Sequence, residues 1–220
     1  MISQLGFFSL IFNIIFSLFV IFSCSKSVFK ENLIIENNLY YTIFLQLFFV
    51  IFSFCCLVVV FLISDFSNIT VYNNSHTTKP FFYKFSGVWG NHEGSLLLWL
   101  LVLILFLFLF VLNSKKENKN YVILTVLFQE IIILGFLLFI VLTSNPFEYL
   151  IPKPNEGLGL NPILQDPALA IHPPLLYLGY VGYSLIFSLA ISALFIKNIN
   201  NYWLIILKKW SLISWTFLTC

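Results

Sequence analysis

The sequence is short of charged residues. It has no arginine, and its eleven lysines and nine acidic residues amount to only 9% of 220 residues. Soluble globular domains carry roughly a quarter charged residues, whereas hydrophobic residues make up 60% of this chain. This balance excludes a soluble enzyme and offers no basic patch for nucleic acid. It predicts an all-α polytopic membrane protein surrounded by lipid.

Cysteine is also scarce. The four cysteines are Cys24, Cys55, Cys56 and Cys220, and all lie in or next to apolar stretches. Their spacing does not match a zinc site, and the C-x-x-C-H motif that attaches haem in c-type cytochromes is absent. We therefore expect the thiols to act as small buried apolar side chains.

Five apolar stretches have about the 20 residues that a transmembrane helix needs, and a sixth begins but has only about half that length. They cover residues 5–22, 39–63, 95–112, 121–142 and 175–196, and a sixth begins at Trp210. The first lacks the basic start and small-residue cleavage site of a signal peptide, so we expect it to be retained. We predict about six transmembrane helices in a single membrane domain that covers residues 1–220.

The lysines are divided unequally between the predicted loops. Loops after the first, third and fifth stretches carry eight: Lys26, Lys30, Lys115, Lys116, Lys119, Lys197, Lys208 and Lys209. Loops after the second and fourth carry three: Lys79, Lys84 and Lys153. The positive-inside rule then places the lysine-rich loops in the cytoplasm or the mitochondrial matrix. The two long loops, 65–94 and 145–174, would share the outer face.

The segment from Asn145 to Gly182 holds seven of the eight prolines. Prolines interrupt helices, and long loops without structure of their own are usually functional or disordered. Disorder fits poorly, because the segment is rich in leucine and isoleucine. We expect a non-helical loop that ends at the Pro173–Pro174 pair, where the fifth helix would begin.

His172 stands at the end of this loop. A neutral imidazole is a good axial ligand for haem iron, and two prolines would hold its backbone stiffly. A histidine hydrogen-bonded at the membrane interface explains the residue equally well. Asp166 and Gln165 precede it; a carboxylate could orient the imidazole, or Asp166-Pro167 could simply start a turn or a helix.

A second polar group opens the third apolar stretch, in WGNHEGSLLLW. Glu93 is favoured near a helix N-terminus, where Ser95 could serve as a cap. The alternative is that Trp89, His92 and Glu93 form a wall of a haem or partner site, since their loop is predicted on the same face as His172. Leu96 excludes the H-E-x-x-H zinc motif.

Glu130 is the ionisable residue deepest within an apolar stretch. Carboxylates in a membrane are costly, and they are functional candidates for that reason. With Gln129, it could relay protons or could join helices as a protonated hydrogen-bonding group. A transporter or a subunit of a proton-translocating complex is therefore the alternative function.

Three motifs resemble one family. LNPILQDPALAIHPPLLYLGYVG (160–182), VWGNHEGSLLLW (88–99) and TSNPF (143–147) occur in the order and separation found in CcmF, the haem lyase of cytochrome c maturation. The resemblance covers nearly the whole chain but about a third of the family's length. The chain lacks the family's tryptophan-rich WGxxW-x-WD loop, as either a fragment of a longer protein or the product of a split mitochondrial gene would; we expect the split gene. The shorter CcmC family carries that loop, so it fits less well.

The resemblance implies a function and a ligand. His172 would be one of two axial histidines that bind haem b in transit to cytochrome c, with Gln165, Asp166, Trp89, His92 and Glu93 around it. The enzyme forms thioethers with an apocytochrome c C-x-x-C-H site. Because the tryptophan-rich loop and the second histidine are missing, we do not expect this chain to be catalytic alone.

The resemblance also implies partners and a location. The expected partners are a C-terminal CcmF piece with the tryptophan-rich loop, a CcmE-type haem chaperone, a CcmH-type thiol protein and apocytochrome c. The expected location is the mitochondrial inner membrane with the motif loops facing the intermembrane space; a bacterial inner membrane with periplasmic loops is the alternative.

Overall fold

The computed structural model describes residues 1–30, 36–114, 118–159, 165–196 and 201–220. These residues form eight α-helices and no strand longer than a single bridge. The helices are α1 (Ile2–Lys30), α2 (Glu36–Leu62), α3 (Ile69–Asn74), α4 (Phe81–Ser86), α5 (His92–Asn113), α6 (Lys119–Thr143), α7 (Pro167–Ile196) and α8 (Asn201–Leu218). Five of them, α1, α2, α5, α6 and α7, are long and apolar enough to cross a membrane. The expected all-α polytopic membrane fold is confirmed.

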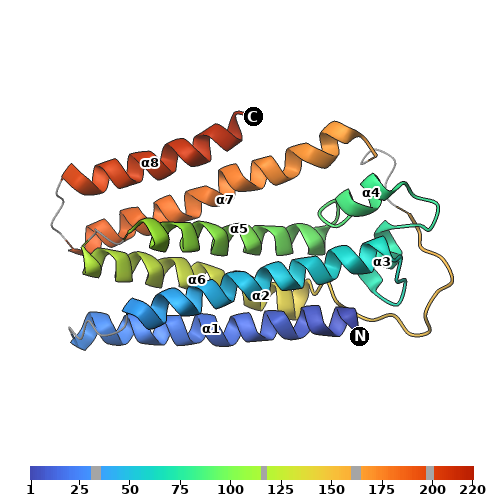
Figure 1. Cartoon of the computed structure of the whole chain (residues 1–220), viewed down its shortest axis with the longest axis horizontal. Coiled ribbons are helices and arrows are strands. Elements are labelled where there is room, and N and C mark those ends of the chain that lie inside the picture. The colour runs from blue at the N-terminus through green and yellow to red at the C-terminus, as the bar shows by residue number, and fades with distance from the viewer. Residues whose placement is uncertain (31–35, 115–117, 160–164, 197–200) are drawn as a thin grey trace.

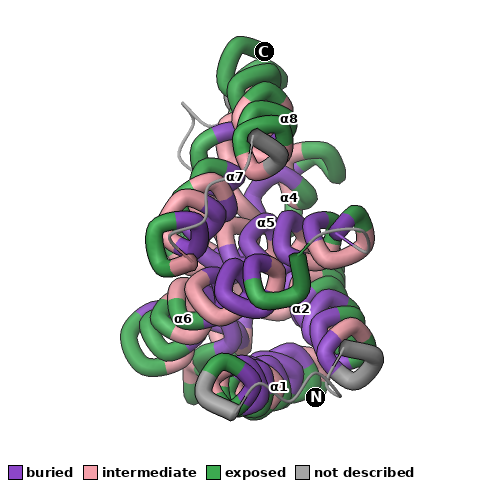
Figure 2. The backbone as a smooth tube through the Cα atoms, turned by 90° about the vertical axis from the view of Figure 1, so that its left-hand side faces the viewer, coloured by how far each residue is buried: buried purple, intermediate pink, exposed green. Residues whose placement is uncertain are grey.

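Helix α5 lies at the centre of the bundle. It packs against α2, α6 and α7, while α1 packs on α2 and α6, and α8 packs on α7 (Figure 1). Burial follows this arrangement, because the buried faces turn inward and exposed faces line the outside of the bundle (Figure 2). Large apolar side chains such as Phe8, Phe48 and Phe187 are exposed on the outer faces. Lipid solvates apolar side chains, so those on the outside of the bundle can stay exposed without loss of stability.

Two neighbouring polar residues at the middle of α6 join it to three other helices. Gln129 donates to the Ser184 hydroxyl of α7 (3.0 Å) and accepts from Ser188 (2.9 Å). Glu130 accepts from Ser17 of α1 (2.7 Å) and from Gln46 of α2 (3.1 Å). Adjacent residues on a helix point about 100° apart, so one dipeptide reaches both sides of the bundle.

The two long loops meet at one end of the bundle (Figure 1). Their backbones are joined by four hydrogen bonds: Ile69 N to Glu148 O (3.0 Å), Leu150 N to Ser67 O (2.8 Å), Leu158 N to Tyr72 O (2.8 Å) and Gly159 N to Ser75 O (3.1 Å). Asn68, which is fully buried, caps α3 and donates its amide to Pro146 O (2.9 Å). The expectation that both loops assemble at the same end is therefore confirmed.

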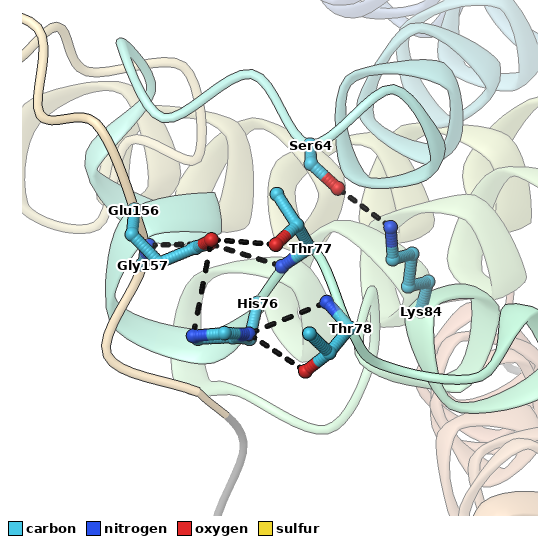
Figure 3. Close-up of polar contacts among 7 residues, drawn as sticks. All are labelled: Ser64, His76, Thr77, Thr78, Lys84, Glu156 and Gly157. Atoms are coloured by element: carbon cyan, nitrogen blue, oxygen red, sulfur yellow. Dashed lines mark hydrogen bonds and ion pairs between the residues drawn. The ribbon is translucent and has the colours of Figure 1, made fainter.

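Side chains clamp the same two loops together (Figure 3). Glu156 accepts hydrogen bonds from the backbone N–H and the hydroxyl of Thr77, and His76 lies 3.9 Å from its carboxylate. Lys153 forms an ion pair with Asp65 at 3.1 Å. At Gly157 a Cβ would run into the Ser75 carbonyl and the Phe66 ring, so only glycine permits this close approach. The paired loops form what we call the loop cap, residues 64–79 and 146–159.

The structure corrects three boundaries predicted from sequence. The first loop is not irregular throughout, since it contains α3 and α4. The last helix begins at Asn201 and not at Trp210, and this predicted sixth span is not among the five helices that are long and apolar enough to cross a membrane. The third correction is the start of α7, which lies at Pro167. Lys115, Lys116, Lys197 and residues 160–164 lie outside the described residues.

The cysteine expectation holds in part. All four cysteines are free thiols. Cys24 and Cys56 are buried as expected, but Cys55 and Cys220 are exposed. Cys55 can be exposed because the outer face of α2 borders lipid, where an apolar thiol costs nothing to expose.

Acid should loosen the loop cap. The hydrogen bond from the Thr77 hydroxyl is the main reason that the pKa of Glu156 is lowered. Burial alone would raise the pKa of Asp65, but hydrogen bonds from Ser67 and Lys153 outweigh it and lower that pKa too. A carboxyl whose pKa is lowered by folding stabilises the fold at neutral pH, and this contribution is lost as the pH falls through the folded pKa. We expect lower protection factors for amide exchange, which are corrected for the intrinsic effect of pH on exchange, in residues 65–78 and 146–159 below about pH 4.

Glu156→Gln tests the assignment, because it removes the titration but keeps the side chain's shape. The variant should show a smaller acid-induced fall in protection factors than the wild type, with the Asp65 contribution remaining. Glu148→Gln is the matched control, since Glu148 is exposed in the same loop. Equal acid responses in wild type and Glu156→Gln would contradict the clamp.

Candidate functional site

The proline-rich segment becomes helical earlier than its prolines suggest. Helix α7 begins at Pro167, so the predicted start at Leu175 is wrong. The Asp166 carboxylate accepts the Ala168 N–H at 2.8 Å, and Pro167 occupies the first helical position, where its missing N–H has no consequence. The helix-start interpretation of Asp166-Pro167 is thus confirmed, and His172 belongs to the helix, not to a loop.

Pro173 and Pro174 therefore lie inside α7. A proline within a helix leaves the carbonyl four residues earlier without its helical donor. For Pro174 that carbonyl belongs to Ala170, and it accepts the indole N–H of Trp89 at 2.8 Å. A side chain from the turn before α5 thus supplies the hydrogen bond that Pro174 cannot. The bond ties the WGNHEG motif to the helix of the HPP motif, two residues from His172.

The turn that carries Trp89 is itself held tightly. Asn91 caps α5 by accepting the Gly94 N–H at 2.8 Å, and its amide donates to the carbonyls of Gly87 (2.7 Å) and Val88 (3.0 Å). The expected cap, Ser95, instead donates to the His92 carbonyl. A Cβ at Gly94 would overlap the Val88 carbonyl, so glycine is required where the chain folds back on itself. The Trp89 ring also packs edge-on against Phe85, with centroids 4.9 Å apart.

His92 and Glu93 lie in the first turn of α5. The helix dipole favours Glu93 there, as expected. The His92 ring is 3.2 Å from the Ser144 hydroxyl at the end of α6. Within the described residues no hydrogen bond or ion pair joins either side chain to His172. Of the three candidates in this motif, Trp89 is the one that the structure brings to α7.

His172 is exposed near the N-terminal end of α7. Among the described residues its imidazole forms no hydrogen bond, so both ring nitrogens are open to a ligand. Gln165 and Asp166 are also exposed at the start of this helix, and neither hydrogen-bonds to His172. The described residues contain no cluster of three or more metal-ligating side chains. A lone imidazole suits an iron that is already held by a porphyrin and does not suit a bare ion such as zinc.

An aromatic cluster extends from the site into the bundle. Trp99 of α5 contacts Phe136 of α6 (centroids 4.9 Å apart) and Tyr180 of α7 (5.1 Å), and Tyr177 packs on Tyr180 (5.2 Å). These rings fix the spacing of α5, α6 and α7 one to two turns below His172. The sequence analysis did not predict this cluster or the Trp89–Ala170 hydrogen bond. The sequence signal for that bond was Pro174, because a proline inside a helix leaves the carbonyl of Ala170, four residues earlier, in need of another donor.

Comparisons with known proteins agree on one family. The family model "Cytochrome C assembly protein" matches residues 89–220. The cytochrome c-type biogenesis protein CycK of Rhizobium meliloti is 49% identical over 170 residues, covering 77% of this chain and 25% of CycK. CcmF of Escherichia coli is 41% identical over 168 residues, covering 76% of this chain and 26% of CcmF.

A solved structure, cytochrome c haem lyase CcmF, has the same fold. Its TM-score is 0.86 at 25% identity, with 100% of this chain and 34% of that chain covered. The chain thus spans about a quarter of the curated relatives and a third of the solved lyase. The matched family model begins at Trp89, the residue that links the two motif regions. On sequence and on structure, this chain belongs to the cytochrome c assembly family, as a CcmF-type protein.

Proposed function

We propose that these 220 residues are part of a haem lyase of cytochrome c maturation, and that His172 contributes one axial ligand to the haem that the enzyme handles. The observation that carries the proposal is the exposed imidazole of His172, which has no hydrogen-bond partner among the described residues and belongs to a helix whose start is fixed by Asp166 and Trp89. Haem is the substrate in transit here. Ile171, next to His172, is exposed and suits contact with a flat apolar macrocycle.

Each residue has a role in this proposal. His172, as neutral imidazole, binds the iron through one nitrogen. Trp89 keeps the first turns of α7 straight, so the ring's direction is set before haem arrives. The loop cap would support the surface beside the ligand, since backbone hydrogen bonds join its two segments. His92, Glu93, Gln165 and Asp166 would contact the outer rim of the bound haem or its donor.

Other proteins or segments would supply the remaining parts of the proposed reaction. A tryptophan-rich loop and a second histidine would complete the haem site, and a CcmE-type chaperone would deliver haem. A CcmH-type thiol protein would present reduced apocytochrome c. We propose the mitochondrial inner membrane as the location, with the loop cap in the intermembrane space; the lysine distribution supports this orientation.

His172→Ala should remove most of the bound haem. The tagged chain would be purified in mild detergent with its associated proteins, and haem absorbance would be measured per mole of chain. We expect at least a tenfold loss of affinity, since an axial ligand contributes more than about 1.4 kcal/mol. His76→Ala, another histidine at the same end of the bundle, is the control and should retain haem. An unchanged haem content in His172→Ala would contradict the assignment of His172 as the ligand but not the assignment of the family.

Trp89→Phe should weaken the same site indirectly. The variant keeps an aromatic ring but leaves the Ala170 carbonyl without a donor, which costs about 1–3 kcal/mol when the group is buried. We expect faster amide exchange in the first turns of α7 and reduced haem content.

Trp99→Phe is the matched control for the loss of an indole N–H. Trp99 packs among aromatic rings, and within the described residues its nitrogen donates no hydrogen bond. It should leave exchange at residues 167–174 unchanged. If both variants behave alike, the Trp89–Ala170 bond has no particular role in holding α7.

A further inference from the structure

A second polar site lies in the membrane interior, away from His172. Glu130 of α6 is fully buried, and one of its oxygens, Oε2, accepts hydrogen bonds from Ser17 of α1 (2.7 Å) and Gln46 of α2 (3.1 Å). The site therefore stands where three transmembrane helices meet. None of the proposed haem chemistry uses it.

Two oxygens in this site have no donor. The other carboxyl oxygen, Glu130 Oε1, is buried and without a partner among the described residues, and so is the amide oxygen Gln46 Oε1. An ionised carboxylate only accepts hydrogen bonds, as an amide oxygen does, so neither could satisfy the other. Leaving both bare in a low-dielectric interior would cost several kcal/mol.

No compensating charge is present. In the described part of the chain, no lysine or histidine contacts Glu130. The titratable side chain that faces it is Cys24 of α1, which also interacts with it electrostatically. From α2 comes the neutral Gln46, and the neighbouring Gln129 occupies the hydroxyls of α7. No charged side chain of α5 contacts it among the described residues. A bare negative charge here would have neither counterion nor enough donors.

We propose that Glu130 is a proton-binding site, in which a proton on Oε1 is donated to Gln46 Oε1. Gln46 Nε2 already donates to Glu130 Oε2, so the proton closes a two-bond ring between a carboxylic acid and an amide. One proton thereby satisfies both unpaired oxygens and neutralises the charge. Ser17 adds a third helix to the ring. The ligand of this site is a proton, and its binding links α1, α2 and α6.

Infrared spectroscopy tests the proposal directly. The full chain, purified in mild detergent and labelled with glutamate that carries ¹³C in its carboxyl group, should show the isotope-shifted carbonyl band of a protonated carboxylic acid at pH 7. The remaining glutamates should be ionised at this pH, since the usual pKa of glutamate is about 4.3. Absence of the labelled band at pH 7 overturns the proposal.

Variants assign the band. Glu130→Gln should abolish it, and Glu130→Asp, which keeps a carboxyl group but carries no label, should abolish the labelled band as well. Glu148→Gln, an exposed glutamate in the loop cap, should leave it unchanged. Gln46→Leu should shift the band, because the acid then loses its amide partner. A labelled band that survives Glu130→Asp, or one that Gln46→Leu does not shift, contradicts the site.

A pH titration gives a second test. A proton held in the folded state and released on unfolding makes stability fall as the pH rises. The wild type should therefore lose thermal stability towards alkaline pH by more than Glu130→Gln, whose amide cannot ionise. Equal alkaline losses in the two proteins would show that no proton at Glu130 supports the fold.

Discussion

The candidate site depends on one missing N–H group. Pro174 cannot donate to the Ala170 carbonyl, and inside a membrane protein such a carbonyl must find another donor. Trp89 provides it from a different part of the chain, 81 residues away. Because the turn before α5 is held by Asn91 and by the close approach at Gly94, the indole is presented from a rigid support. The direction of His172 is thus set by a helix that two distant motifs build together.

The helices beneath the site are joined by polar contacts at a few points and by packing elsewhere. Apolar side chains on the outer faces gain little from burial in lipid, so hydrogen bonds and close packing must specify which helices meet. Gln129 and Glu130 do this for α6, whose two sides contact α7 and the pair α1 and α2. The loop cap does the same at one end of the bundle, where backbone hydrogen bonds join segments from two loops.

This organisation accounts for how a chain with about a quarter of its relatives' length can have a packed interior of its own. The relatives are three to four times as long, yet the shared portion has its own buried centre in α5 and its own cross-linked cap. Apolar faces on α7 and α8, with Phe195 and Trp215 exposed, border either lipid or further helices. A haem held at His172 would lie above this scaffold, and the reactive groups around it would come from neighbouring segments.

Much of the fold could be read from local patterns. Long apolar runs predicted the transmembrane helices, because a bilayer leaves the backbone few other ways to satisfy its hydrogen bonds. The motifs around Trp89 and His172 indicated the family. The start of α7 was misjudged, since three prolines close together read as a loop; Asp166 capping and the Trp89 donor make a helix possible there.

The amino-acid sequence alone indicates the apolar helices, the family and the histidine before two prolines. Three contacts became known only from the packed helices: Trp89 completes the helix of that histidine, His92 lies beside Ser144, and Glu130 meets Gln46 and Ser17. Hydropathy depends on each residue's own contact with lipid and is local. Pairing of a donor with an acceptor depends on how helices pack, and that is settled only when distant segments come together.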